Sequence, residues 1–141
     1  MAKVLTLDDV DLEGRTVLVR VDINSPMDPE TNVFLDDTRI KRIIPTLNKL
    51  SNSKVVLLAH QSRPGKKDFT STLGHSRELG RLLGKNVKWV DDIYGKKALA
   101  AIENMENGDL LMLNNVRMDD AEINTKGDFV TMSHTMLVQN L

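Results

Sequence analysis

Short apolar runs alternate along the chain with stretches in which apolar residues recur at helical spacing. Four runs rich in valine and leucine are typical of strands, and they lie at residues 16–21, 54–59, 87–90 and 109–113. The second run is almost continuously apolar, which favours a strand that is buried on both faces of a sheet. Two longer polar stretches that contain proline are predicted to be loops, at residues 23–34 and 61–70.

Helical spacing predicts four helices, at residues 38–50, 72–83, 96–105 and 128–141. Pro45 lies within the first helix, and we expect a kink or break there because proline lacks a backbone N–H and clashes with the preceding turn. Gly84 follows the second helix and marks its expected end. The alternation of strands and helices predicts an α/β fold, with a Rossmann-like, three-layer parallel sheet of about four strands and right-handed crossover helices.

Composition narrows the class of protein. A chain of 141 residues is one domain's worth, so residues 1–141 are expected to form a single domain. Nineteen Lys+Arg against twenty Asp+Glu give a net charge of −1, which argues against a general nucleic-acid binder. The absence of cysteine excludes disulfides and thiol catalysis. No apolar run approaches the roughly 20 residues of a membrane span and no signal peptide is evident, so we expect a cytoplasmic protein.

Candidate site residues follow the predicted strands, because open parallel sheets bind ligands beyond the carboxyl ends of their strands. Polar residues at these positions include Gln61, Ser62, Asn114 and Asn115. The candidates for binding, with one arginine at the start of the first helix on the same edge, are Asp22, Asn24, Arg39, His60, Arg63 and Arg117. Guanidinium groups match carboxylate and phosphate oxygens, and helix N-termini add partial positive charge. The rim therefore suits a small anionic ligand.

Each candidate also has a purely structural interpretation. Asp22 fits a turn or a helix cap, His60 a hydrogen-bonded loop residue, and Arg63 a solvated loop residue. The adjacent pair Asp91 and Asp92 fits a helix cap better than a ligand contact. His75 and His134 are interpreted as ordinary residues of helix surfaces. The convergence of several candidates on one rim favours function more than any one of them does.

No motif for nucleotide activation accompanies this rim. The sequence lacks GxGxxG, GxxxxGK[ST], GxSxG and HExxH, and its three histidines are far apart. The residues alone therefore predict an anion site with no cofactor and no metal bound by this chain. A receiver-like α/β domain that uses Asp22 is a further alternative. Such a domain needs a pair of acidic residues clustered at particular strand ends, and this sequence has no such pair there.

Specific strings point to a family. VLVRVDINSP, DDTRI, LLAHQSRPG and NNVR occur in the order and spacing of phosphoglycerate kinases, which the chain resembles from about Leu5 to Arg117. VDINSP, AHQSRPGKKDFT and VDDIYG are most similar to the archaeal branch. The resemblance implies the N-terminal domain, which holds 3-phosphoglycerate, while the C-terminal domain of the family holds MgATP or MgADP. It also implies that Arg39 is catalytic and stabilises the charge of the phosphoryl group in transfer.

The resemblance assigns the other candidates to the substrate. Asp22 and Asn24 would line the glycerate end. The substrate phosphate would be bound by His60, Arg63 and Arg117. The expected role is therefore the 3-phosphoglycerate half-site of an enzyme of glycolysis and gluconeogenesis.

The chain departs from the family pattern at two positions and in length. The family motif similar to ENVRF is NNVRM here, with Asn114 in place of glutamate and Met118 in place of phenylalanine. The later segments of the N-terminal domain and the whole nucleotide domain are not in the sequence, so we expect no phosphoryl transfer by this chain alone. The fourth strand, at 109–113, is expected to have an unpaired edge that invites pairing with another chain, unless residues 128–141 cover it.

Two alternatives stay open beside the half-site of a truncated kinase. One is a non-catalytic pseudoenzyme that binds a phospho-acid. The other is an interaction module that pairs with a full-length kinase, with the missing C-terminal region or with itself.

Overall fold

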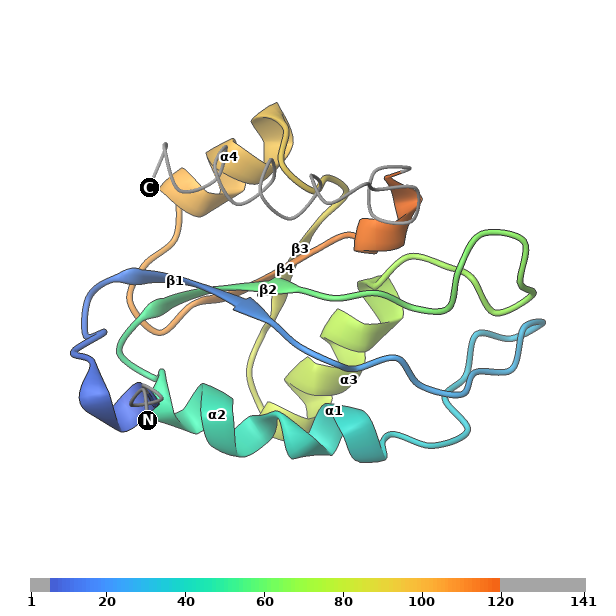
Figure 1. Ribbon diagram of the computed structural model, residues 1–141, viewed down its shortest axis with the longest axis horizontal. Helices are drawn as coiled ribbons and strands as arrows, with labels where there is room; N and C mark the ends of the chain where they lie inside the picture. Colours follow the sequence, from blue (N-terminus) through green and yellow to red (C-terminus); the bar gives the residue numbers. More distant parts are fainter. Residues whose placement is uncertain (1–5, 120–141) are drawn as a thin grey trace, which may run out of the picture.

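The structure is a computed structural model that describes residues 6–119, and its central feature is a four-stranded parallel sheet (Figure 1). The strands are β1 (Thr16–Arg20), β2 (Lys54–Leu58), β3 (Lys88–Val90) and β4 (Leu110–Leu113). They lie in the order β1-β2-β4-β3, and every neighbouring pair is parallel. Each strand falls within its predicted run, so the prediction of a parallel α/β sheet is confirmed.

The helices begin and end close to where local sequence signals place them. They are α1 (Thr38–Arg42), α2 (Ile44–Lys49), α3 (Leu73–Leu83) and α4 (Lys96–Glu103), with short 3₁₀ turns η1 (Leu7–Asp9) and η2 (Val116–Met118). The predicted break is present: α1 and α2 are separate, and Pro45 lies in the first turn of α2, where its missing N–H is tolerated. α3 ends at Gly84, whose φ of 69° is the left-handed conformation typical of a helix end.

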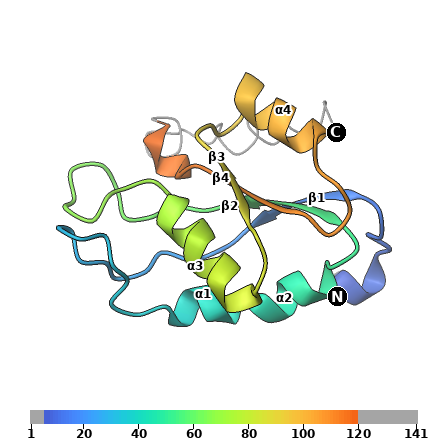
Figure 2. The same cartoon turned by 180° about the vertical axis from the view of Figure 1, so that it is seen from behind.

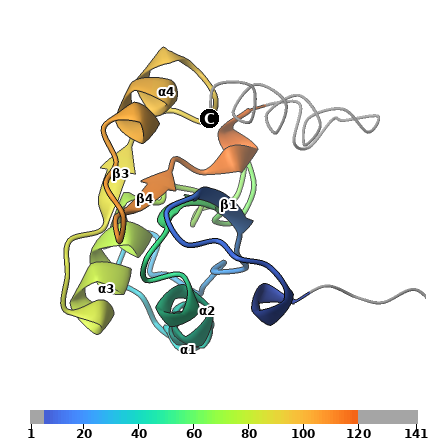
Figure 3. The same cartoon turned by 90° about the vertical axis from the view of Figure 1, so that its left-hand side faces the viewer.

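Helices cover both faces of the sheet, so the three-layer prediction is also confirmed. α4 lies on one side and α1, α2 and α3 lie on the other (Figure 2, Figure 3). Val55 and Leu57 of β2 belong to the core cluster that includes Leu79 of α3, whereas Val56 belongs to the cluster that includes Ile102 of α4. β2 is thus buried on both faces, as its continuous apolar run predicts.

The expectation of an unpaired edge at the fourth strand is wrong. β4 pairs with β2 on one side and with β3 on the other, so the outer strands of the described sheet are β1 and β3. After β2 the chain forms β3 two positions along the sheet, and it then returns through α4 to form β4 between β2 and β3. Because this return runs in the opposite direction, a right-handed crossover places α4 on the opposite face. The predicted helix at 128–141, and the edge cover expected from it, lie outside the described residues.

Gly80 of α3 provides a test of the packing. A β-carbon at Gly80 would lie 2.8 Å from the backbone oxygen of Lys85, whereas one at Gly74 in the same helix would meet side chains no closer than 3.9 Å. We expect Gly80→Ala to lower the free energy of unfolding by about 1–2 kcal/mol, since the backbone must shift to admit the methyl group. Gly74→Ala is the matched control and should be neutral or slightly stabilising. Urea unfolding of both variants measures the difference, and equal stability would contradict this packing.

Candidate functional site

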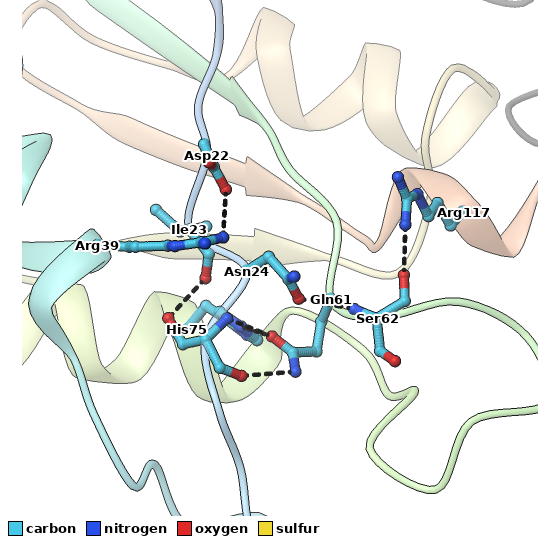
Figure 4. A network of polar contacts seen from close by, with 9 residues as sticks. Asp22, Ile23, Asn24, Arg39, Gln61, Ser62, His75 and Arg117 are labelled. Atoms are coloured by element: carbon cyan, nitrogen blue, oxygen red, sulfur yellow. Dashed lines mark hydrogen bonds and ion pairs between the residues drawn. The ribbon is translucent and has the colours of Figure 1, made fainter.

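The loops that follow β1, β2 and β4 meet at the carboxyl edge of the sheet, together with the start of α1. Figure 4 shows four of the candidate residues at this edge, around Gln61 and Ser62; they are Asp22, Asn24, Arg39 and Arg117. His60 and Arg63 flank Gln61 and Ser62 in the chain. The sheet topology therefore brings the sequence candidates to one edge, the edge at which parallel sheets bind ligands.

Asp22 and Arg39 form an ion pair at the open side of this edge. Arg39 Nη1 lies 3.2 Å from Asp22 Oδ1, and the two side chains are 50% and 70% exposed. An ion pair this exposed contributes little to stability. The guanidinium is therefore held near the edge while most of its donors stay accessible to a ligand.

Asn24 and Arg39 line a cavity of about 390 Å³ between the loop after β1 and the start of α1. Ser25, Pro26, Asp36, Thr38 and Asp68 complete the lining. Hydrogen bonds from the hydroxyl and the backbone N–H of Thr38 hold the pKa of Asp36 below its usual value. Asp68 accepts a hydrogen bond from the Ser62 hydroxyl at 2.6 Å. Both carboxylates therefore have partners within the protein, and Arg39 is the cation of the lining.

The other four candidates lie outside this lining: Asp22, which pairs with Arg39, and His60, Arg63 and Arg117. Arg117 Nη1 donates to the carbonyl oxygen of Ser62 at 3.0 Å, and the Ser62 hydroxyl joins it to the cavity wall through Asp68. The Arg63 side chain is exposed, and within residues 6–119 its guanidinium has no hydrogen bond or ion pair. His60 is partly buried. Arg63 and Arg117 thus place guanidinium groups on the loops after β2 and β4.

Asn115 follows β4 at this edge, and the sequence analysis gave it no role. Its Nδ2 donates to the carbonyl oxygens of Gln61 at 2.8 Å and of Thr70 at 2.7 Å, and its Oδ1 accepts from the backbone N–H of Arg117 at 3.0 Å. The side chain is fully buried. Asn115 therefore joins the loop after β4 to both ends of the loop after β2.

Asn114, at the position where the resemblance implies a glutamate in the family, makes a bond that a carboxylate cannot make. Its Nδ2 donates to Asp91 Oδ1 at 2.7 Å, while its Oδ1 accepts from the backbone N–H of Asn115 at 2.7 Å. Asp92 accepts from the backbone N–H groups of Ile93 and Ala98, both at 2.9 Å, at the start of α4. The N-cap residue of α4 is Gly95, but the Asp92 carboxylate bonds the Ala98 N–H of the first turn as a capping side chain does, whereas Asp91 holds Asn114.

The interpretation of His75 as a surface residue is wrong. His75 is fully buried, its Nε2 lies 2.9 Å from Gln61 Oε1, and its ring meets Phe34 edge-on at 4.8 Å between centroids. The signal was in the sequence: His75 stands four residues before Leu79, on the apolar stripe of the helix. His134 lies outside the described residues.

Burial makes His75 a source of acid sensitivity. Desolvation, with a smaller contribution from His60, lowers the pKa of His75 from 6.5 to about 4. Between these values the unfolded chain binds the extra proton and the folded chain does not, so the free energy of unfolding falls as the pH falls. We expect a loss of about 2 kcal/mol from this group between pH 7 and pH 5. Urea unfolding at the two pH values measures it, with His75→Phe as the non-titrating control; an equal loss in the variant would contradict the assignment.

Other features of the described residues limit the chemistry. No group of three or more histidine, aspartate or glutamate side chains within residues 6–119 could hold a metal ion. None of the helices found there is long and apolar enough to span a membrane. The arrangement can bind and orient an anion through fixed loops and guanidinium donors.

Comparisons of the sequence and of the structure with known proteins all find the same family. The family model for phosphoglycerate kinase matches residues 7–140. Phosphoglycerate kinase 2 of Methanosarcina acetivorans is 57% identical over 118 residues, which are 84% of this chain and 28% of the relative. The phosphoglycerate kinase of Methanothermus fervidus is 50% identical, over 100% of this chain and 35% of its own. The crystal structure of the enzyme from Pyrococcus horikoshii matches with a TM-score of 0.87 at 31% identity, over 95% of this chain and 35% of that chain. The chain thus spans about a third of the length of these relatives.

Proposed function

The chain belongs to the phosphoglycerate kinase family, and from that membership we propose that its carboxyl edge is the half-site that binds 3-phosphoglycerate. The observation that carries the proposal is the cavity of about 390 Å³ between Asn24 and Arg39, at the edge where three strand loops meet. Its size suits a small phospho-acid. Its position follows the rule for open parallel sheets.

In this proposal each candidate residue has one task. Asp22 and Asn24 contact the glycerate hydroxyl and carboxylate end, with Asn24 held by the bond of 2.9 Å from the Ser62 N–H to its Oδ1. The substrate phosphate is bound by His60, Arg63 and Arg117. Charge-assisted bonds of this kind are the strong ones in anion recognition.

Arg39 is the proposed catalytic residue. Phosphoryl transfer between a nucleotide and a carboxylate needs positioning and stabilisation of charge more than covalent help from the protein. Arg39 has exposed guanidinium donors beside the cavity, and Asp22 orients them. MgATP or MgADP would be held by a region outside residues 6–119, so this chain supplies one half of the reaction. A cytoplasmic location stays a prediction.

The alternative is a binding module without turnover. Asn114 favours it, because the amide that donates to Asp91 stands where the family has a carboxylate. Both proposals predict binding of the phospho-acid. They differ when the missing region of a relative is supplied in trans, since only the half-site of an enzyme then supports phosphoryl transfer.

Titration calorimetry of the 141-residue chain with 3-phosphoglycerate tests the binding that both proposals share. We expect saturable binding that weakens as salt rises, because the contacts are charged. Glycerate without the phosphate is the matched control and should bind much more weakly. Absence of binding at millimolar 3-phosphoglycerate, or equal binding of glycerate, would contradict the half-site.

A further inference from the structure

Gln61 joins the first two loops of the edge through its side chain. Its Oε1 accepts from the backbone N–H of Ser25 at 3.0 Å, and its Nε2 donates to the carbonyl oxygen of Ser25 at 2.8 Å. The amide thus pairs with both backbone groups of one residue, as a neighbouring strand would, beyond the point where the ladder of β1 and β2 ends. Both residues are buried, and Ser25 is part of the cavity lining.

The Ser25 N–H determines which end of the Gln61 amide faces His75. Because that N–H needs an acceptor, Oε1 must face it, and the same oxygen lies 2.9 Å from His75 Nε2 (Figure 4). His75 is therefore the donor, in the Nε2–H tautomer. Its lowered pKa keeps the ring neutral near pH 7, with one proton to donate.

The contribution of the Nε2–H donor can be judged from the other ring nitrogen of His75, Nδ1. Nδ1 is buried and has no hydrogen-bond partner within residues 6–119. A buried acceptor without a donor is unfavourable. A phenylalanine at this position would keep the ring contact with Phe34 and would avoid the cost of that unpaired nitrogen. What histidine adds at this position is the Nε2–H bond to Gln61.

We infer that His75 is a positioning residue, which orients Gln61 and so holds the Ser25 wall of the cavity against the loop that carries His60 and Arg63. The inference rests on the proposed function for the identity of the ligand. His75 itself is not part of the cavity lining. The Gln61 amide is neutral, buried and bonded at both its oxygen and its nitrogen, and such a group fixes one geometry, which a binding site of charged loops needs.

Two substitutions separate positioning from packing. His75→Phe keeps the ring and removes both nitrogens, so we expect an unfolding midpoint close to that of the wild type and 3-phosphoglycerate binding weaker by about fivefold. His75→Gln keeps a donor at nearly the same reach and should restore most of the binding. Equal affinity of His75→Phe and the wild type would overturn the inference.

Two measurements on the ligand-free chain keep this test independent of the proposed function. Long-range proton–nitrogen spectra should show the Nε2–H tautomer of His75, and the Ser25 amide should exchange with solvent about fivefold faster in His75→Phe. An Nδ1–H tautomer, or unchanged exchange of Ser25, would overturn the inference. Failure of the wild-type chain to bind 3-phosphoglycerate would instead overturn the proposed function.

Discussion

Replacing Arg39 or Arg63 with alanine weakens the binding of 3-phosphoglycerate by about 1.5–3 kcal/mol in each variant, the range for hydrogen bonds to charged groups. This is roughly a tenfold to 150-fold rise in Kd. Folding should be almost unaffected: the Arg39 ion pair with Asp22 is largely exposed, and the Arg63 side chain is itself exposed. Calorimetry gives the affinity and urea unfolding gives the stability.

A third arginine provides the matched control. Arg15 is exposed and directly precedes β1, at the opposite edge of the sheet. Arg15→Ala removes the same charge from the protein, so it should leave the affinity within about twofold of the wild type if the effect is local. Unchanged binding of 3-phosphoglycerate in both Arg39→Ala and Arg63→Ala would contradict the half-site proposal.

Asn115→Ala has the largest expected effect on stability, a loss of about 2–4 kcal/mol in the free energy of unfolding. The substitution leaves the carbonyl oxygens of Gln61 and Thr70 without the donor that each now has, and the backbone N–H of Arg117 without its acceptor. Because Asn115 is fully buried, water does not replace these bonds without opening the loops. Binding should weaken too, since the loop after β2 loses its tie to the loop after β4.

Asn104 is the control for that substitution. Its amide also donates to a carbonyl oxygen, that of Ala100 at 2.9 Å, but the residue is exposed at the end of α4. We expect Asn104→Ala to change the free energy of unfolding by no more than about 0.5 kcal/mol. The single tryptophan, Trp89, reports unfolding in both variants. Similar losses in the two variants would contradict the role given to Asn115.

Local patterns predicted the elements of this fold because each element carries its own signal. The apolar run of β2 predicted a strand buried on both faces, Pro45 predicted the break between α1 and α2, and Gly84 predicted the end of α3. The place of β4 was not predictable in this way. Its position between β2 and β3 depends on which way the crossover after β3 turns, and no residue of the strand itself records that choice.

The candidate site was predicted in part, for a similar reason. Residues that follow strands could be placed at one edge because the carboxyl ends of parallel strands share it. The role of Gln61 and Asn115 in holding the loops was missed, since both act through contacts with residues 36 and 54 positions away in the chain. His75 was misassigned because its chemistry was weighed without its place on the apolar stripe of α3.

The most direct test of the half-site is a proton–nitrogen correlation spectrum of the 141-residue chain, recorded with and without 3-phosphoglycerate. We predict a dispersed spectrum in which saturating ligand shifts the amide signals of the proposed contacts, which are Asp22, Asn24, Arg39, His60, Arg63 and Arg117. Signals at the opposite edge, around Arg15 and Gly108, should stay in place. A collapsed spectrum, or one that 3-phosphoglycerate leaves unchanged, would contradict the half-site.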